Sequence, residues 1–493
     1  MNNSTLKNIF NSLVMIVFQL ICILFLAISF TILPIFSIYR YLVGMYLQRK
    51  YNCPIEFLHG MDAVFCFNDK NIPFNIEGCH IYKGTYNIDQ LRQRFERILN
   101  IREIDGRWKY MRFRQQMKKE LGYFFCIPQT EFRYENHIKE YDGPPLKNKD
   151  ELQQLIAWQY RNLPVDKGIF WQVILVPLSD TFITDTPQPQ HMVFFSVAHA
   201  VMDGISILRI YGKLFDDEAD ESLFLFGTIS PPGVMEQMFF WKNAFLYGFA
   251  EYFLHILKVE KHCLHGMPLS GDMLISISES ICIKRVKEIK NFYKTTTNDV
   301  LQSCIVGALR KYIISEGQQI PSLMKFKIPV SLHSMQKEVK IENNISAGTI
   351  EVPIDEATCV GRLMKTKAVI DKLKRSPDIY LTHFLGKVFI NRFPLMLTLV
   401  LAKRASSTAT VSCMPLVPSK KLFGNEALQQ YIGTGTPDGV SGCGMSVTII
   451  SERETALCTI KADLAIVKTQ ENVNKINHFL LEEIDELYQS IYK

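Results

Sequence analysis

Several catalytic signatures are absent from the 493 residues: there is no Walker loop, no G-x-S-x-G elbow and no H-E-x-x-H sequence. Their absence excludes the usual phosphate cradle, hydrolase nucleophile and metalloprotease zinc site. The twelve cysteines include no C-x-x-C pair, so we expect reduced thiols in a cytosol-facing protein. The stretch HCLH at 262–265 has the residue types of a zinc site but no matching second half, and we expect no metal.

The sequence also has little net charge. Its 55 Lys and Arg are nearly balanced by 49 Asp and Glu, which leaves a net charge of +6. So weak and scattered a surplus argues against nucleic acid and suits an anionic ligand or a membrane surface. Apolar residues make up 47% of the chain, which excludes a disordered protein. The length predicts two or more domains.

No charged residue lies between Lys7 and Arg40. About 20 apolar residues cross a bilayer, so the first 50 residues are predicted to be a membrane anchor that spans with tilt or continues along the interface after Pro34. Arg49 and Lys50 follow the span, which favours a single-pass protein with its large C-terminal part in the cytosol. The endoplasmic reticulum is the expected membrane, with the lipid droplet and the plasma membrane as alternatives.

Two later apolar segments are interrupted or short. The segment 235–258 carries spaced charges among aromatic residues, which suits a helix lying in the headgroup layer and equally a helix packed on the protein core. The segment 393–402 has only ten residues and is expected to be a core helix.

A cluster of Gly and Pro at 227–235 divides the remaining chain. We predict an N-terminal domain over 51–226, a linker with a candidate interfacial helix over 227–268, and a C-terminal domain over 269–493. Strands are predicted at 171–178, 191–198, 325–332, 347–354, 409–416 and 444–451. Helices alternate with them, including 298–314 with Asn298 as its cap and a final amphipathic helix near the C-terminus. This mixture predicts an α/β or α+β fold.

One histidine interrupts the apolar run FFSVAHAVMDGISI at 194–207. The run predicts a buried central strand that ends at His199, with Gly204 permitting a tight turn into a helix. A neutral imidazole at such a strand end can remove a proton from a hydroxyl group, and Asp203 can orient the imidazole or hold the turn. The structural alternative is a core histidine bonded to a backbone carbonyl, with Asp203 as a helix cap.

The stretch AHAVMDG resembles the H-H-x-x-x-D-G motif of the wax ester synthase/diacylglycerol acyltransferase family. Other blocks resemble that family's motifs and follow its order: PIEFLHGMDAVF (54–65), FRYENHI (132–138), GIFWQVILVP (168–177), TNDVLQSCIVGALRKYI (297–313), KIPVSLHS (327–334), NNISAGTIEVPI (343–354), VSCMPLVP (411–418) and CGMSVTIIS (443–451). The resemblance covers nearly all of the chain after the anchor.

This resemblance implies two chloramphenicol acetyltransferase-like domains with a tunnel between them. It implies transfer of a fatty acyl group from acyl-CoA, as co-substrate, to a long-chain alcohol or diacylglycerol, with no bound cofactor. His199 would be the general base, with Asp203 and Gly204 in the same motif. Ser446 occupies the family's asparagine position in G-L-N-I-T and is a candidate oxyanion donor. Asn298 and Asp299 form the N-D motif, which we expect to position the helix or the tunnel wall.

Three positions depart from the family pattern. Ala198 replaces the first histidine of the motif, His333 stands where P-V-S-L-R has arginine, and Cys413 replaces asparagine in S-N-V-P. In the superfamily the motif aspartate commonly pairs with an arginine, so the partner of Asp203 is open. The departures keep two alternatives in view: a lipid- or acyl-CoA-binding protein that lost the chemistry, and an enzyme of the same fold with a small soluble acceptor.

Overall fold

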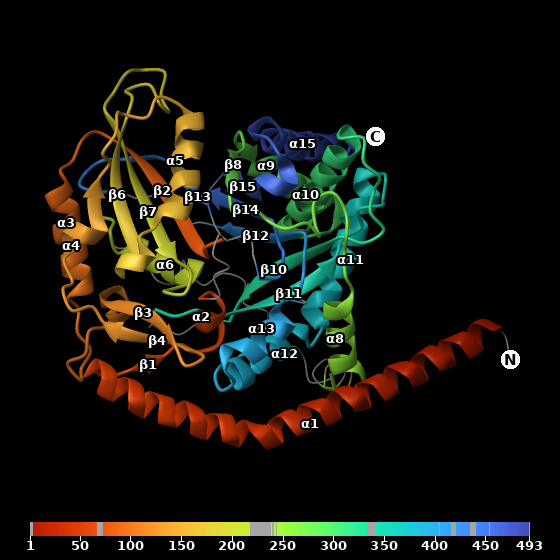
Figure 1. The fold of residues 1–493 in the computed structure, drawn as a ribbon. Helices are drawn as coiled ribbons and strands as arrows, with labels where there is room; N and C mark the ends of the chain where they lie inside the picture. Colours follow the sequence, from red (N-terminus) through yellow and green to blue (C-terminus); the bar gives the residue numbers. More distant parts are fainter. Residues whose placement is uncertain are drawn as a thin grey trace.

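The computed structural model describes residues 3–66, 72–216, 238, 241–242, 244–332, 341–403, 405–415, 421–433, 440–452 and 454–492. Two large sheets stand side by side, each covered by helices, and one long N-terminal helix crosses the base of the molecule (Figure 1).

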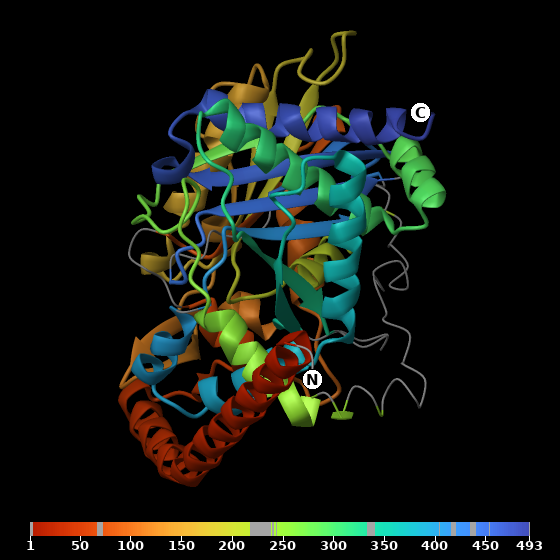
Figure 2. The same ribbon diagram turned by 90° about the vertical axis from the view of Figure 1, so that its right-hand side faces the viewer.

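The N-terminal helix α1 covers Asn3–Tyr51 and contains Pro34. It bends near its middle (Figures 1 and 2), as expected of a helix whose interior proline removes one backbone hydrogen bond. Within the described residues, its segment Ser12–Tyr51 is long and apolar enough to cross a membrane.

The first sheet has the strand order β13-β2-β7-β6-β5. Its strands are β13 (Ala427–Gly433), β2 (Asn75–Lys83), β7 (Gln190–Ala198), β6 (Trp171–Leu178) and β5 (Ile138–Glu140). Helices α3 (Ile88–Leu99) and α6 (Gly204–Gly212) share one core with one face of this sheet. Helix α5 (Lys149–Asn162) packs on the other face together with residues of the second sheet, so that face is buried between the two halves of the molecule.

The second sheet has the order β11-β10-β12-β14-β15-β8, with the short β9 beside β15. Its strands are β11 (Ile345–Glu351), β10 (Lys325–Ser331), β12 (Ala409–Pro415), β14 (Met445–Glu452), β15 (Thr455–Asp463), β8 (Met273–Ile277) and β9 (Ile281–Cys282). One face carries the largest apolar core with helices α9 (Ile283–Tyr293), α10 (Thr297–Ser315), α11 (Cys359–Arg375) and α15 (Gln470–Gln489).

A third, small sheet, β1-β4-β3, lies near the C-terminal end of α1 (Figure 1). It consists of β1 (Glu56–Phe57), β4 (Tyr123–Pro128) and β3 (Gln115–Glu120), with α2 (Gly60–Val64) and the 3-10 helix η1 (Met111–Arg114) nearby in the chain. Five further helical segments form the base above α1: η4 (Ala244–Gly248), α8 (Phe249–Leu257), α12 (Asp378–Leu385), η5 (Gly386–Ile390) and α13 (Leu395–Ala402). Short helices α4 (Tyr134–His137), η2 (Val165–Lys167) and α14 (Leu464–Val467) complete the described elements.

A buried ion pair joins the two large sheets. Lys461 of β15 donates to the carboxylate of Glu77 on β2, and both side chains are almost fully buried. Burial raises the pKa of Glu77 to about 7, although the Lys461 ammonium acts in the opposite direction. A buried pair of this kind fixes how the sheets meet, because neither charge tolerates loss of its partner.

The six predicted strands are confirmed within a few residues, as β6, β7, β10, β11, β12 and β14, and the predicted mixed α/β fold is confirmed with them. One prediction is wrong and another holds in part. Asn298 is not the cap of α10, because Thr296 is the N-cap and forms a capping box with Asp299. The segment 393–402 contains the helix α13, which has only one side in the core, because Leu395 and Thr398 are buried whereas Met396 is 79% exposed.

Candidate active site

His199 lies where the buried strand β7 leaves the sheet. Its backbone N–H donates to the carbonyl of Phe74 at 2.6 Å, and the N–H of Val201 closes a turn on the carbonyl of Ala198 at 2.9 Å. The imidazole is therefore held at a strand end by main-chain bonds on both sides. The apolar run before it forms a strand because both of its faces are covered by core side chains.

The other half of the molecule supplies the hydrogen-bond partner of the imidazole. Asn343, two residues before β11, brings its Oδ1 to 2.9 Å from Nδ1 of His199. Its Nδ2 donates to the carboxylate of Asp62 at 2.8 Å and to the carbonyl of His199 at 2.6 Å. The site is thus built across the junction of the two large sheets.

These contacts determine the tautomer of His199. Both groups that meet Nδ2 of Asn343 are acceptors, so the amide nitrogen must face them and the amide oxygen must face the imidazole. Nδ1 of His199 then carries the proton and donates it. Nε2 keeps its lone pair and makes no hydrogen bond to the residues that the structure describes. This is the form of histidine that can accept a proton from a substrate.

A second charged layer holds Asn343 in place. Asp62 also accepts from the backbone N–H of Asn343 at 3.0 Å, and its other oxygen accepts from Arg112 at 2.5 Å. Arg112 further donates to the carbonyls of Ala200 and Val201, which follow His199 in the turn. Burial lowers the pKa of Arg112, but the charge and the hydrogen bond of Asp62 outweigh it and leave the pKa raised. The chain of contacts runs from Arg112 through Asp62 and Asn343 to the imidazole.

The environment keeps His199 neutral. Burial lowers its pKa below the ordinary value, and the bond from Asn343 and the charges of Asp203 and Asp62 act in the opposite direction. The ring of Phe65 stacks on the imidazole with centroids 3.7 Å apart and planes at 20°. A stacked apolar ring shields the imidazole from water, which disfavours the imidazolium form.

Asp203 and Gly204 organise the turn. Asp203 caps α6, accepting from the backbone N–H of Ser206 at 2.9 Å, and its second oxygen accepts from the backbone N–H of Asn344 at 3.2 Å. The helix-cap role considered from the sequence is therefore present, and Asn344 answers part of the question about the partner of Asp203. Gly204 is the first residue of α6 and does not have a positive φ, so the turn does not depend on the conformational freedom of glycine at this position.

The remaining predicted site residues lie in the second half of the molecule. Ser446 is buried on β14. Its neighbours Met445 and Val447 belong to the core under the helices, so by strand alternation Ser446 lies on the opposite face. Asn298 accepts from Gln302 one turn along α10 at 3.1 Å, and Asp299 completes the capping box of that helix. Both therefore act locally at the start of α10.

Two of the three departures from the family pattern are at Cys413 and His333. Cys413 is half-buried on β12, and burial raises the pKa of its thiol to about 12, so it is a neutral group there. His333 lies outside the described residues. The twelve cysteines are free.

Four residues of the site were not predicted as functional: Asn343, Asp62, Arg112 and Phe65. Three of them stand inside blocks that carried the family resemblance, because Asp62 and Phe65 belong to PIEFLHGMDAVF and Asn343 opens NNISAGTIEVPI. The signal was therefore present, but nothing in the sequence shows that these blocks meet at His199. Arg112 has no such signal.

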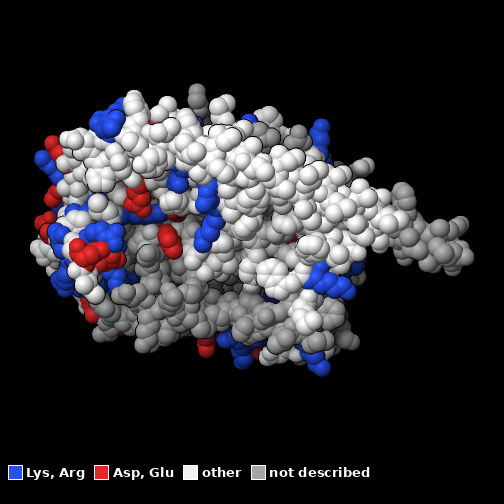
Figure 3. Space-filling model, turned by 90° about the horizontal axis from the view of Figure 1, so that it is seen from below, with Lys and Arg blue, Asp and Glu red and all other residues white. Residues whose placement is uncertain are grey.

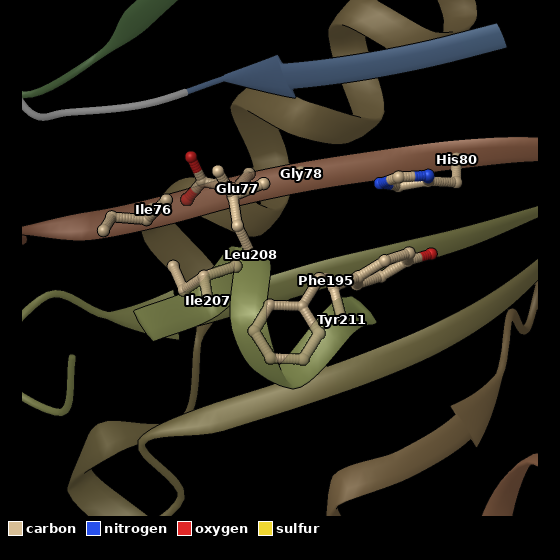
Figure 4. Close-up of a pocket in the computed structure, with 8 residues that line it drawn as sticks. All are labelled: Ile76, Glu77, Gly78, His80, Phe195, Ile207, Leu208 and Tyr211. Atoms are coloured by element: carbon tan, nitrogen blue, oxygen red, sulfur yellow. The ribbon is translucent and has the colours of Figure 1, made fainter. Parts of the chain in front are cut away.

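A small cavity lies near the site but is not part of it. Residues of β2, β7 and α6 line it: Ile76, Glu77, Gly78, His80, Phe195, Ile207, Leu208 and Tyr211 (Figure 4). Its volume of about 20 Å³ suffices for one water molecule and not for a substrate. The tunnel implied by the family resemblance stays a prediction.

The fold is that of the chloramphenicol acetyltransferase-like acyltransferases, with a histidine site at the junction of two mixed sheets. The wax ester synthase/diacylglycerol acyltransferase from Marinobacter aquaeolei VT8 aligns with a TM-score of 0.59 and 16% identity over 89% of this chain and 100% of that chain. TRI3 trichothecene 15-O-acetyltransferase from Fusarium sporotrichioides aligns with a TM-score of 0.56 and 13% identity, covering 87% of this chain and 95% of that chain. The starter condensation domain of rhizomide synthetase RzmA, solved with C8-CoA and Leu-SNAC, gives a TM-score of 0.51 and 12% identity, covering 84% and 89%.

Residues 341–485 match the family model of the WS/DGAT C-terminal domain. This model belongs to the family whose motifs the sequence resembles, and fold and family model together support an acyltransferase. The match begins at residue 341, so it includes Asn343 of the site. No curated protein matches the sequence.

Proposed function

We propose that the protein is a membrane-bound O-acyltransferase that moves a fatty acyl group from acyl-CoA to a long-chain alcohol or diacylglycerol, forming a wax ester or triacylglycerol. The single observation that carries this proposal is the tautomer of His199: Nδ1 is held by Asn343, and Nε2 makes no hydrogen bond to any described residue. The WS/DGAT family match and the apolar helix α1 support lipid substrates at a bilayer. We place the catalytic part on the cytosolic side of the endoplasmic reticulum.

The proposed reaction needs one base and no resident cofactor. Nε2 of His199 takes the proton of the acceptor hydroxyl, and the hydroxyl oxygen attacks the thioester carbonyl carbon. A C–O bond forms, and the carbonyl oxygen becomes a tetrahedral oxyanion. When the C–S bond breaks, the CoA thiolate takes the proton from the imidazolium. The products are an ester and free CoA, and His199 returns to its starting form.

Other side chains have supporting roles in this proposal. Asn343, backed by Asp62 and Arg112, positions the imidazole and fixes its tautomer. Ser446 is the candidate donor to the oxyanion, since it is a buried hydroxyl on the face of β14 away from the helical layer. Asp203 holds the turn, and its charge favours the imidazolium that forms during the reaction.

The test compares membranes carrying the wild-type chain and the His199→Ala chain. Labelled palmitoyl-CoA is supplied with hexadecanol in one reaction and dioleoylglycerol in another. Wild type is expected to form a labelled ester with one or both, and His199→Ala to lose about 10²–10⁴ of the rate. His191→Ala is the matched control, because His191 lies on the same strand and bonds the carbonyl of Gly84.

Either failure has a defined meaning. Equal rates for wild type and His199→Ala would remove His199 from the mechanism. Acyl-CoA binding without any ester from either acceptor would instead favour a binding protein that kept the fold.

A further inference from the structure

The long helix α1 is in contact with the body of the protein along most of its length. The side-chain amide of Gln19 accepts from the backbone N–H of Ala250 at 2.7 Å and donates to the carbonyl of Phe245 at 2.9 Å. Near its other end, Leu47 is fully buried in the core of the small sheet. These contacts fasten the helix from residue 19 to residue 47.

Aromatic contacts fill the distance between those points. Phe30 packs on Phe389 with ring centroids 5.6 Å apart, and Phe36 meets Phe393 edge-on at 4.9 Å. The hydroxyl of Tyr39 donates to the carbonyl of Leu121 at 3.3 Å. From residue 19 to residue 39, α1 therefore contacts first η4 and α8, then η5 and the loop after it, and finally the turn between β3 and β4. Figure 1 shows α1 running across the base below these elements.

This fastening leaves too little free helix to cross a bilayer. Residues 3–18 of α1 extend about 24 Å at 1.5 Å per residue, whereas the hydrocarbon core is about 30 Å thick. A crossing by the later part of α1 would carry the packed elements into the hydrocarbon as well. Those elements expose charged residues, among them Glu251 of α8 and Lys387 of η5, whose placement there is costly.

The outward face of α1 is nevertheless apolar. At helical spacing, one stripe contains Leu20, Leu24, Ile28, Ile35, Ile38 and Leu42, all of them more than half exposed. A surface helix that faces water has a polar outer stripe. Since the described part of the body covers the opposite side of α1, the exposed stripe needs an apolar partner.

Neighbouring elements extend the same surface. Large apolar side chains are exposed on the segments that pack against α1 or lie beside it: Trp241, Phe245, Phe384, Met396 and Leu397. Viewed from below, α1 and its surroundings form a broad uncharged surface, with Lys and Arg at its edges and Asp and Glu among them on the left of the view (Figure 3). Exposed Lys242, Lys387 and Lys403 lie in these segments and suit anionic lipid headgroups.

We propose that this base, formed by α1 together with η4, α8, α12, η5 and α13, is a bilayer-docking surface on which α1 lies in the plane of one leaflet without crossing it. The N-terminus and the catalytic body are then on the same side of the membrane, in place of the single-pass topology expected from the sequence. The partner is a lipid bilayer, favoured over a second copy of the chain by the exposed Lys242, Lys387 and Lys403 on the segments that carry the apolar side chains. The inference concerns how the chain meets a membrane and does not depend on the proposed reaction.

The first experiment determines topology with the full-length chain. An N-terminal extension carrying an epitope and a glycosylation acceptor is added, and a second epitope is placed at the C-terminus. In sealed microsomes, both epitopes are expected to be cleaved by added protease, and the extension is expected to stay unglycosylated. A protected or glycosylated extension with a cleaved C-terminal epitope would establish a crossing helix and overturn the proposal.

The second experiment tests the surface itself. The triple variant Leu24→Glu, Ile28→Glu, Ile35→Glu is compared with Ile104→Glu, an exposed isoleucine in the loop between α3 and η1. Binding to vesicles of phosphatidylcholine with 20% phosphatidylserine (about 1 in 5 lipids, to supply the surface potential) is expected to fall at least about tenfold for the triple variant only. Equal thermal unfolding of both variants confirms that each is folded.

Two outcomes would overturn the assignment. The triple variant could bind vesicles like wild type, or it could dissociate a dimer while vesicle binding is unchanged, which would make the base an interface between copies. Ester formation measured in detergent reports the proposed reaction separately, so failure of one proposal is distinguishable from failure of the other.

Discussion

Asn343→Ala is the substitution that most directly tests how the site works. It removes Oδ1 of Asn343, which lies 2.9 Å from Nδ1 of His199 and accepts its proton. It also removes the amide nitrogen that donates to the carboxylate of Asp62. Leaving a buried hydrogen-bonding group without its partner costs about 1–3 kcal/mol. If that loss falls on the transition state, kcat/KM decreases by about 5- to 150-fold, at 1.36 kcal/mol for each factor of ten. Removing the base itself should cost more.

The pH dependence separates a positioning role from a general loss of structure. The bond from Asn343 raises the pKa of His199, so its removal lowers that pKa further. The reactive form is the neutral imidazole, and activity is lost as pH falls through the pKa. The acid limb of the kcat/KM profile is therefore expected to move to lower pH in Asn343→Ala, even though the plateau is lower.

Asn344→Ala is the matched control for this experiment. Within the part of the chain that the structure describes, the Asn344 side chain donates to the carbonyl of Leu332 at 3.1 Å and makes no contact with His199, and the backbone bond of Asn344 to Asp203 survives the substitution. We expect this variant to keep its plateau within about twofold and its acid limb unmoved. An unchanged Asn343→Ala enzyme, or equal losses in the two variants, would refute the role assigned to Asn343.

Three further predictions concern pH, glycine positions and the domain junction. Because burial lowers the pKa of His199, wild-type activity should be constant from about pH 7 to 8 and decline only below about 6.5; an acid limb above pH 7 would contradict the neutral base. Gly204→Ala should leave activity within about twofold, since the added Cβ makes only an ordinary contact at 3.7 Å. Gly307→Ala, in contrast, should lower the free energy of unfolding by about 1–3 kcal/mol, because its Cβ overlaps the carboxylate of Glu483. Equal melting temperatures for wild type and Gly307→Ala would argue against that overlap. Lys461→Met should cost about 3–5 kcal/mol in urea unfolding by stranding a buried carboxylate, and simultaneous replacement of that carboxylate by an apolar residue should recover much of the loss.

The elements that the sequence predicts well are those whose pattern is local. Strands β6 and β7 are uninterrupted apolar runs because both faces of their sheet are covered, and such runs are readable without a structure. The start of α10 was misplaced by two residues because Thr296, Asn298 and Asp299 are all good capping residues. Only the backbone geometry distinguishes among them.

The residues that make up the site can be predicted from the sequence only in part. His199 stands out in the sequence because it interrupts an apolar strand. Asn343 does not, since its contact with His199 joins residues 144 positions apart and depends on how β11 meets the end of β7. The outer face of α1 was similarly hidden, because an apolar helix has the same composition whether it crosses a bilayer or lies along it. The difference comes from what packs on the other side.

Strand β13 has a consequence for the order in which the chain can fold. It completes the first sheet from near the end of the sequence, with Ala427 opposite Tyr82 and Gly433 opposite Glu77. During synthesis this edge of β2 therefore stays unpaired until β13, more than 340 residues later in the chain, has left the ribosome. Pairing at such long separation slows folding, and an open strand edge invites association with other chains. A chain truncated before residue 427 should accordingly aggregate, even though most of the first sheet is present.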